Sequence, residues 1–154
     1  MGAKVKNPRK KFLWSIMFPK HPINTYLFQS CTLPDIEIDQ VAHGDVNRDV
    51  KTAGRVTIGN LVVEKLMTTA GSDTWLHDWL YSCQDHIVGG GLVPSQYWET
   101  AIVNELAEDG VSVLNTHVFE EVWPCKITGL DLDRMASENT IESIEFSVGT
   151  ADKY

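Results

Sequence analysis

The sequence predicts a mainly β fold, a β-sandwich or barrel with one flanking α-helix, and three observations point to it. Short runs alternate apolar and polar side chains, as "DIEIDQV" does at residues 35–41. A single stretch, "GSDTWLHDWLYSC" at residues 71–83, repeats its apolar residues at helical spacing. Glycine-containing turn signals such as Asp109-Gly110 separate strand-like runs. A chain of 154 residues suits one domain of this kind.

The strand signal is carried by segments that are rich in aromatic and β-branched residues or alternate in polarity. In chain order they are "NTYLFQSC" (24–31), "DIEIDQV" (35–41), "RVTIGNLVVEKLM" (55–67), a hairpin over 95–127 with Asp109-Gly110 at its turn, and "IESIEFSV" (141–148). The apolar parity shifts at Gly59-Asn60, which predicts a bulge or bend there. In the last strand, Ile144 and Phe146 should face inward and Glu145 outward.

Residues 71–83 form the one predicted helix. Ser72 or Asp73 can cap its start. Its apolar residues recur at three- and four-residue spacing: Trp75, Leu76, Trp79 and Leu80. We expect its tryptophans to pack in the core rather than to stack on a ligand.

Charge is divided unevenly along the chain. The residues before Asp35 include six bases and no acid, whereas all 21 acids stand at Asp35 or later. We therefore predict a basic N-terminal arm over residues 1–22 and a β domain over 23–154, with the prolines of "FPKHP" ending the arm. The arm is either a flexible tail or a segment that contacts an acidic surface of another subunit and becomes ordered on assembly.

Composition also narrows the functional classes. The net charge of −8 argues against a nucleic-acid binder, because neutralising phosphates requires bases. No apolar run approaches the ~20 residues that span a bilayer, and the first residues lack a signal-peptide core, so we expect a protein that is made and kept inside a cell. The widely spaced Cys31, Cys83 and Cys125 favour buried free thiols, with a crosslink between copies as the lesser alternative.

A search for catalytic or metal-binding patterns finds none that is convincing. "GGG" at 89–91 lacks the following lysine of a phosphate-binding loop, and no serine has the glycine spacing of a nucleophile elbow. The best zinc candidates, His77, Cys83 and His86, would not converge on a helix. Asp131 and Asp133 could share a face, but without a calcium-loop pattern an acidic solvated loop is favoured. We expect no enzyme, no cofactor and no metal.

The order of these features resembles the tail tube proteins of contractile-tailed bacteriophages, which are related to the tube protein of type VI secretion. The pieces that match best are "KTAGRVTIGNLVVEKL" (51–66), "VWPCKITGLDLD" (122–133) and the final "SENTIESIEFSV" (137–148). The resemblance covers about residues 22–154. It implies a structural protomer whose hexameric rings stack into a hollow tube inside a contractile sheath and conduct DNA at ejection.

The same resemblance implies partners and a location. The partners would be further copies of the chain, the tail sheath protein, the baseplate or tube initiator, the tail terminator, and a tape measure protein in the lumen, with DNA only in transit. The protein would be part of the virion tail, assembled in the host bacterial cytoplasm.

The resemblance leads to two groups of candidate site residues, the first by position in the sequence and the second by the charge expected of a DNA conduit. The polar stretch 43–54 corresponds to the loop that reaches the adjacent ring, and its charged contacts would be Asp45, Arg48, Asp49 and Lys51. This stretch is also too long for a tight turn, as functional loops often are. An acidic lumen would repel phosphate and let DNA slide, so we expect some outward-facing strand acids to line it, the candidates being Glu99, Glu105, Glu120, Glu142 and Glu145. Acids kept only for solubility are the alternative for each.

Three other functions remain open from the sequence. The chain could be the baseplate protein on which a tube starts, or the type VI secretion tube protein, since both share the fold. From another class, it could be a ligand-binding or enzymatic β-barrel. That function would need converging polar groups, which no sequence cluster supplies.

Overall fold

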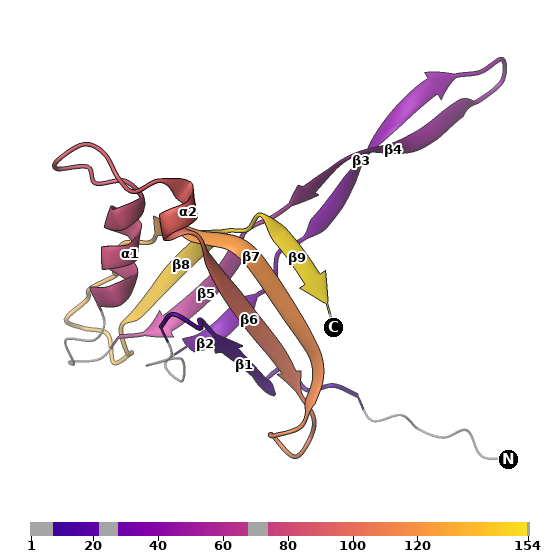
Figure 1. The fold of residues 1–154 in the computed structure, drawn as a ribbon. Helices are drawn as coiled ribbons and strands as arrows, with labels where there is room; N and C mark the ends of the chain where they lie inside the picture. Colours follow the sequence, from indigo (N-terminus) through magenta and orange to yellow (C-terminus); the bar gives the residue numbers. More distant parts are fainter. Residues whose placement is uncertain (1–7, 22–27, 68–73, 154) are drawn as a thin grey trace, which may run out of the picture.

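The computed structural model describes residues 8–21, 28–67 and 74–153. Within them the chain is mainly β, with a flanking helix, as predicted (Figure 1). The elements are β1 (Trp14–Met17), β2 (Phe28–Thr32), β3 (Ile36–Gly44), β4 (Asp49–Ile58), β5 (Leu61–Leu66), α1 (Trp75–Cys83), α2 (Pro94–Tyr97), β6 (Glu99–Leu106), β7 (Val113–Ile127), β8 (Ile141–Ser147) and β9 (Thr150–Lys153). The short α2 and β9 were not predicted.

Seven strands form one sheet in the order β1-β6-β7-β8-β5-β2, with β9 added to β7, while β3 and β4 form a separate two-stranded ribbon. Strand β7 belongs to both halves of the large sheet. Its first part pairs with β6 and β9, and its last part, from Trp123, pairs with β8. Between the two parts Glu121 has φ 55°, and the register against β6 shifts. This bulge bends the strand and folds the sheet over its own core.

Aromatic rings fill the centre of that core. Phe18 is fully buried, and its ring centroid lies 5.3 Å from that of Phe146, 5.8 Å from Trp75 and 5.9 Å from Trp79. Such tilted and edge-on contacts are the favoured geometries for aromatic pairs. Leu61, Val63 and Ile144 complete the fully buried set on β5 and β8, so the core joins residues from both ends of the chain.

Helix α1 covers one side of this core through its predicted apolar face. Leu76 is fully buried and Trp79 is 5% exposed, while the Trp79 indole donates a hydrogen bond to the Tyr97 carbonyl at 2.9 Å. The N-cap position is Thr74, whose side chain makes no capping hydrogen bond. The predicted caps, Ser72 and Asp73, lie outside the described residues.

The predicted boundary of the arm at residue 22 is wrong. Trp14–Met17 form β1 antiparallel to β6, and Ile16 and Phe18 are core residues. The alternation of Trp14, Ile16 and Phe18 carries this strand signal, but it stands between lysines and prolines that pointed to an arm. Residues 1–7 and 22–27, which belong to the predicted arm and to the start of the domain, lie outside the described residues.

Two interruptions that the sequence predicts, at Gly59-Asn60 and at Asp109-Gly110, are present in the structure. Ile58 ends β4, and after Gly59-Asn60 the chain enters β5 of a different sheet. Asp109-Gly110 lies at the tip of the β6–β7 hairpin, although the connection is wider than two residues. Gly110 has φ +74°, and Asp109 Oδ1 accepts from the Val111 and Ser112 amides at 3.0 and 2.9 Å. Such side-chain acceptors are typical of turns.

Replacing Phe18 tests whether residues before the predicted boundary stabilise the fold. We expect Phe18→Ala to lower the free energy of unfolding by about 3–5 kcal/mol, because it removes a fully buried ring and leaves a cavity. Phe12→Ala is the matched control, since Phe12 is 75% exposed, and should change stability by less than about 0.5 kcal/mol. Urea unfolding followed by tryptophan fluorescence measures both. Equal effects of the two substitutions would contradict a core role for Phe18.

Candidate assembly interface

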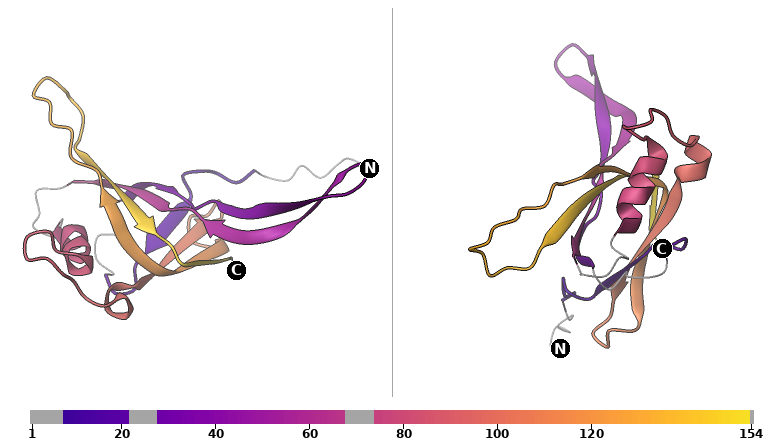
Figure 2. Two further views of the ribbon diagram at one scale, coloured as in Figure 1. Left: turned by 90° about the horizontal axis from the view of Figure 1, so that it is seen from above. Right: turned by 90° about the vertical axis from the view of Figure 1, so that its left-hand side faces the viewer.

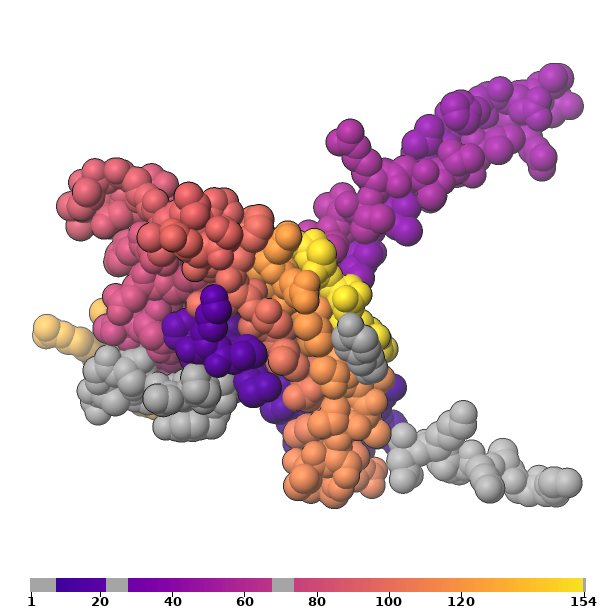
Figure 3. Space-filling view, viewed as in Figure 1, coloured from indigo at the N-terminus to yellow at the C-terminus, as the bar shows by residue number. Residues whose placement is uncertain are grey.

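Strands β3 and β4 form a ribbon that projects from the body (Figures 1 and 3). The prediction of a loop over residues 43–54 is therefore wrong for most of its length, because only residues 45–48 form the turn. The Asp45 amide donates to the Arg48 carbonyl at 2.8 Å, so these two residues form the tip. Asp49 and Lys51 lie on β4, opposite Gly44 and Ala42. The strands lack clean alternation there because neither face of the ribbon is buried in the protomer.

The ribbon carries an apolar stripe into solvent. Ile36 pairs with Ile58 and Ile38 pairs with Val56, and residues directly opposite in an antiparallel pair share a face. Ile58 packs against the core, whereas Ile36, Ile38 and Val56 are 60%, 53% and 58% exposed. The stripe thus continues the core outward along one face. A two-stranded hairpin is at best marginally stable alone in water, and an exposed apolar patch marks an interaction site.

A bulge divides the ribbon into two parts. The register shifts between Ile38 and Gln40, and a Cβ on Gly54 would lie 3.0 Å from the Asp39 carbonyl oxygen. Glycine is therefore favoured where the two backbones approach most closely. Beyond the bulge, Val41 lies on the other side of β3 from Ile38, because side chains alternate along a strand. The ribbon consequently offers apolar side chains on both faces.

The large sheet also keeps free edges. Among the described strands, β1 pairs only with β6, β2 only with β5, and β9 only with β7. Unpaired edges of this kind are templates for strand addition. The outer strand β9 ends in Asp152 and Lys153, and charged residues at an edge limit unselective pairing.

The candidate lumen acids fall into two groups. Glu99 and Glu105 alternate in step with the buried Ala101 and Val103 of β6, and Glu142 alternates with the buried Ile144 of β8. The prediction that these three acids face outward is therefore wrong.

The other two candidates lie on outward faces of their strands. Glu120 follows the buried Phe119 on β7, and Glu145 stands between the buried Ile144 and Phe146 on β8. Their role in a lumen stays a prediction.

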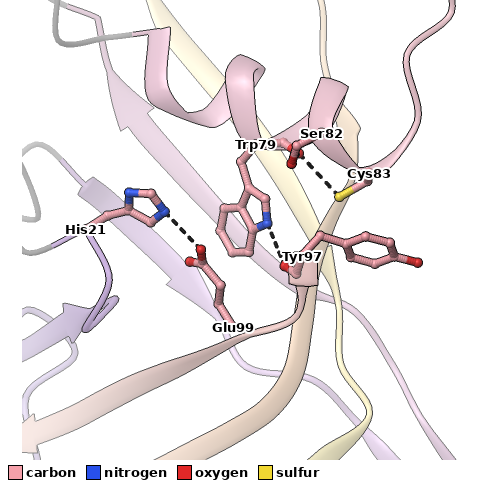
Figure 4. A network of polar contacts seen from close by, with 6 residues as sticks. All are labelled: His21, Trp79, Ser82, Cys83, Tyr97 and Glu99. Atoms are coloured by element: carbon pink, nitrogen blue, oxygen red, sulfur yellow. Dashed lines mark hydrogen bonds and ion pairs between the residues drawn. The ribbon is translucent and has the colours of Figure 1, made fainter. Parts of the chain in front are cut away.

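Two of the inward-facing acids are hydrogen-bonded to histidines. Glu142 is 2% exposed, and its Oε2 lies 3.0 Å from Nε2 of His77 on α1. Glu99 Oε1 lies 3.1 Å from Nε2 of His21 (Figure 4), whose ring packs on Trp75 at a centroid distance of 4.8 Å. Both contacts join segments far apart in the sequence, which is why alternation alone placed these acids on the wrong face. They hold α1 and the residues after β1 against the sheet.

Glu105 anchors the N-terminal segment. Its Oε2 lies 2.8 Å from Arg9 Nη1 and accepts a hydrogen bond from Asn115 Nδ2 at 2.8 Å, and His117 Nε2 lies 3.7 Å from its Oε1. The Asn115 hydrogen bond, followed by the nearby charges of Arg9, His117 and Lys153, lowers the pKa of Glu105. No local sequence pattern indicates this cluster, because Arg9 and Glu105 are 96 positions apart.

The described part of the chain has no group of three His, Cys, Asp or Glu side chains that could hold a metal ion. His77 contacts Glu142, and His86 lies against Tyr81 at a ring-centroid distance of 5.4 Å. Burial raises the pKa of the Cys31 thiol to about 12, which leaves it protonated and weakly nucleophilic at neutral pH. No helix in the described ranges has the length and apolarity required to cross a membrane.

The Glu105 cluster predicts a pH-dependent stability difference. Since folding lowers its pKa below the ordinary 4.5, the ionised carboxylate stabilises the fold above that pH, and this stabilisation is lost as the pH falls. We expect Glu105→Gln to cost roughly 1 kcal/mol at pH 7 and progressively less below pH 4.5. Urea titrations at several pH values measure the difference. Glu138→Gln, at an exposed loop position, is the control, and a pH-independent cost for Glu105→Gln would contradict the assignment.

Comparisons with known proteins agree with this architecture. The family described as T4-like virus tail tube protein gp19 matches residues 10–150. Tail tube protein gp19 of Enterobacteria phage T4 is 26% identical over 127 residues, which are 80% of this chain and 77% of that protein.

Solved structures share the fold at low sequence identity. The tube terminating cap of the anti-feeding prophage has a TM-score of 0.82 at 15% identity, covering 100% of this chain and 95% of that one. A sheath–tube complex of the extracellular contractile injection system PVC has a TM-score of 0.79 at 18% identity, covering 97% and 93%. Hcp1 from Flavobacterium johnsoniae has a TM-score of 0.50 at 14% identity, covering 92% and 94%. The chain belongs to the T4-like tail tube protein gp19 family, which is a family of structural proteins and not of enzymes.

Proposed function

We propose that this chain is the repeating protomer of a tail tube, in which hexameric rings stack into a hollow tube inside a contractile sheath. The observation that carries the proposal is the β3–β4 ribbon. It extends an apolar stripe from the core into solvent, with Ile36, Ile38 and Val56 more than half exposed. Such a stripe gains hydrophobic stabilisation only when a partner covers it. A tube made of identical subunits supplies that partner at every position.

Stacking and ring closure would use different parts of the protomer. The ribbon reaches the adjacent ring, with Asp45 and Arg48 at its tip and Asp49 and Lys51 on β4 as charged contacts. Its mixed charge suits pairing between identical subunits. Within a ring, the free edges of the large sheet meet segments of neighbouring copies. Cyclic closure then removes exposed edges, which an isolated protomer cannot do.

The partners follow from the family and from the similar assemblies. The contractile injection system to which the chain is similar has a sheath–tube complex and a sheath/tube terminator, and the anti-feeding prophage has a baseplate. We infer that this protein contacts a sheath protein, a terminator and a baseplate or initiator, as part of a virion tail assembled in the bacterial cytoplasm. A tape measure protein would occupy the lumen before DNA passes.

The lumen is best assigned to the outward face of β6, β7 and β9. On this face, Val118 of β7 lies between Ile102 of β6 and Asp152 of β9. Farther along, Asn104 of β6 lies opposite Thr116 of β7. Glu120 continues the face along β7. These side chains are neutral or acidic, so they do not attract phosphate. The outward face of the other half is less suitable, because there Glu145 stands opposite Lys126.

Polar substitutions in the ribbon stripe test the stacking role. We expect Ile38→Ser together with Val56→Ser to abolish tubes while changing protomer stability by less than about 0.5 kcal/mol, because both side chains are exposed in the protomer. Negative-stain electron microscopy and light scattering measure assembly, and urea unfolding measures stability. Ile87→Ser with Val88→Ser, at two 82% exposed positions in the loop after α1, is the control. Normal tubes from the ribbon variant would contradict the proposal.

Charge reversal tests the lumen assignment. Tubes of Glu120→Lys should retain duplex DNA in a salt-dependent manner, because lysines ringing the lumen would bind phosphate, whereas Glu145→Lys tubes should retain much less inside. DNA protected from nuclease within purified tubes is the quantity to measure at low and high salt. The reverse ranking of the two variants would show that the other face lines the lumen.

A further inference from the structure

The large sheet folds over its core, but its two end strands, β1 and β2, do not pair with each other, and a groove lies between them. The volume of this groove is about 1040 Å³. Its walls include the apolar side chains of Trp14, Ile16 and Phe28. Its rim carries Arg9, Lys10 and Lys11. Arg9 is paired with Glu105, while Lys10 and Lys11 are exposed and make no ion pair with any described residue. The groove therefore has apolar side chains beside the polar Ser15, Gln29, Ser30 and Thr32 in its walls, and bases at its rim.

A second feature has the opposite charge. The connection between β7 and β8, residues 128–140, contains no helix or strand and projects from the body in both views of Figure 2. Loops of this length without secondary structure are uncommon in compact domains and are usually functional or disordered. Leu130, Leu132 and Met135 are 41%, 76% and 91% exposed. The backbone of residues 129–132 makes no hydrogen bond within the described part of the chain.

The sequence of this segment matches the groove. "GLDLD", residues 129–133, alternates leucine with aspartate. In an extended conformation Leu130 and Leu132 would point to one side and Asp131 and Asp133 to the other. An apolar side facing the groove walls and an acidic side facing the lysines would bury the leucines and pair the charges. The unpaired edges of β1 and β2 could supply backbone hydrogen bonds.

We propose that residues 129–133 of one copy dock in the β1–β2 groove of the neighbouring copy. The segment joins two central strands, and the groove lies at the ends of the strand order, so the contact joins different patches on two copies. Such a heterologous contact generates a ring when its rotation closes. The inference rests on the proposed ring assembly and identifies one of its contacts. It also assigns Lys10 and Lys11 of the predicted arm to an acidic surface of a neighbour.

Photo-crosslinking from the groove tests the docking directly. Phe12 lines the groove and is 75% exposed, and benzoylphenylalanine in its place should crosslink to a neighbouring copy in assembled tubes. Trypsin should release that neighbour's segment as residues 127–134, which mass spectrometry identifies. The control is the same photoreactive group at Met17, which is exposed on β1 but does not line the groove. Crosslinks from position 12 to the β3–β4 ribbon, or to no neighbouring copy, would overturn the proposal.

A charge exchange provides the second test. Asp131→Lys with Asp133→Lys, and separately Lys10→Asp with Lys11→Asp, should each lower tube yield at least about tenfold, because like charges then meet at the contact. The four substitutions together should restore tubes. Glu138→Lys, in the same loop but outside the segment, should leave the yield unchanged.

The outcomes separate the two proposals. Two results would overturn the docking alone, provided that the wild-type chain forms tubes. In the first, the two charge-reversal variants form tubes as well as the wild type does. In the second, the variant with all four substitutions stays unassembled. A wild-type chain that forms neither rings nor tubes under any condition, including with its initiator, would overturn the proposed function and the docking with it.

Discussion

Strand β7 is the element on which the rest of the structure depends. It pairs with β6 and β9 along its first part and with β8 along its last, so both halves of the sheet are fixed through one backbone. The bend at Glu121 is stabilised by close packing with the β8–β9 connection. The Gly149 amide donates to the Glu120 carbonyl at 3.0 Å, and a Cβ on Gly149 would lie 2.6 Å from the Glu121 Cβ. A side chain at position 149 would therefore displace Glu121 or the β8–β9 connection.

Ionisable side chains are buried where the helix meets the sheet. Glu142 and Lys65 are both buried and lie directly opposite each other on β8 and β5, and His77 of α1 approaches Glu142. Buried charges are costly, and removing one partner leaves the other uncompensated. These contacts therefore fix the position of α1 more specifically than its apolar face alone could. The same reasoning applies to His21 and Glu99, which join the residues after β1 to β6.

The protomer is stable in its core but incomplete at its surface. Its ribbon and its sheet edges leave apolar side chains and backbone groups exposed, which is unfavourable for a monomer and suitable for a subunit. This separation between a buried core and exposed contact surfaces suits a subunit of a self-assembling tube, because different residues serve folding and assembly. In the proposed tube, the body that β7 joins would fold first, and the exposed elements would then bind identical copies.

The sequence by itself determined the β class, the helix, the β6–β7 hairpin and the family, because alternation, helical spacing and turn residues are local signals. Tertiary structure decided the rest. Only strand pairing shows that β1 belongs to the sheet and that residues 43–54 continue the ribbon, since those residues lack the alternation that marks residues 35–41. Only packing shows that Glu99, Glu105 and Glu142 face inward, since their partners His21, Arg9 and His77 lie far away in sequence. Alternation in the sequence indicates which side of a strand is apolar. It does not show whether a distant histidine or arginine makes it favourable for an acidic side chain to face the core.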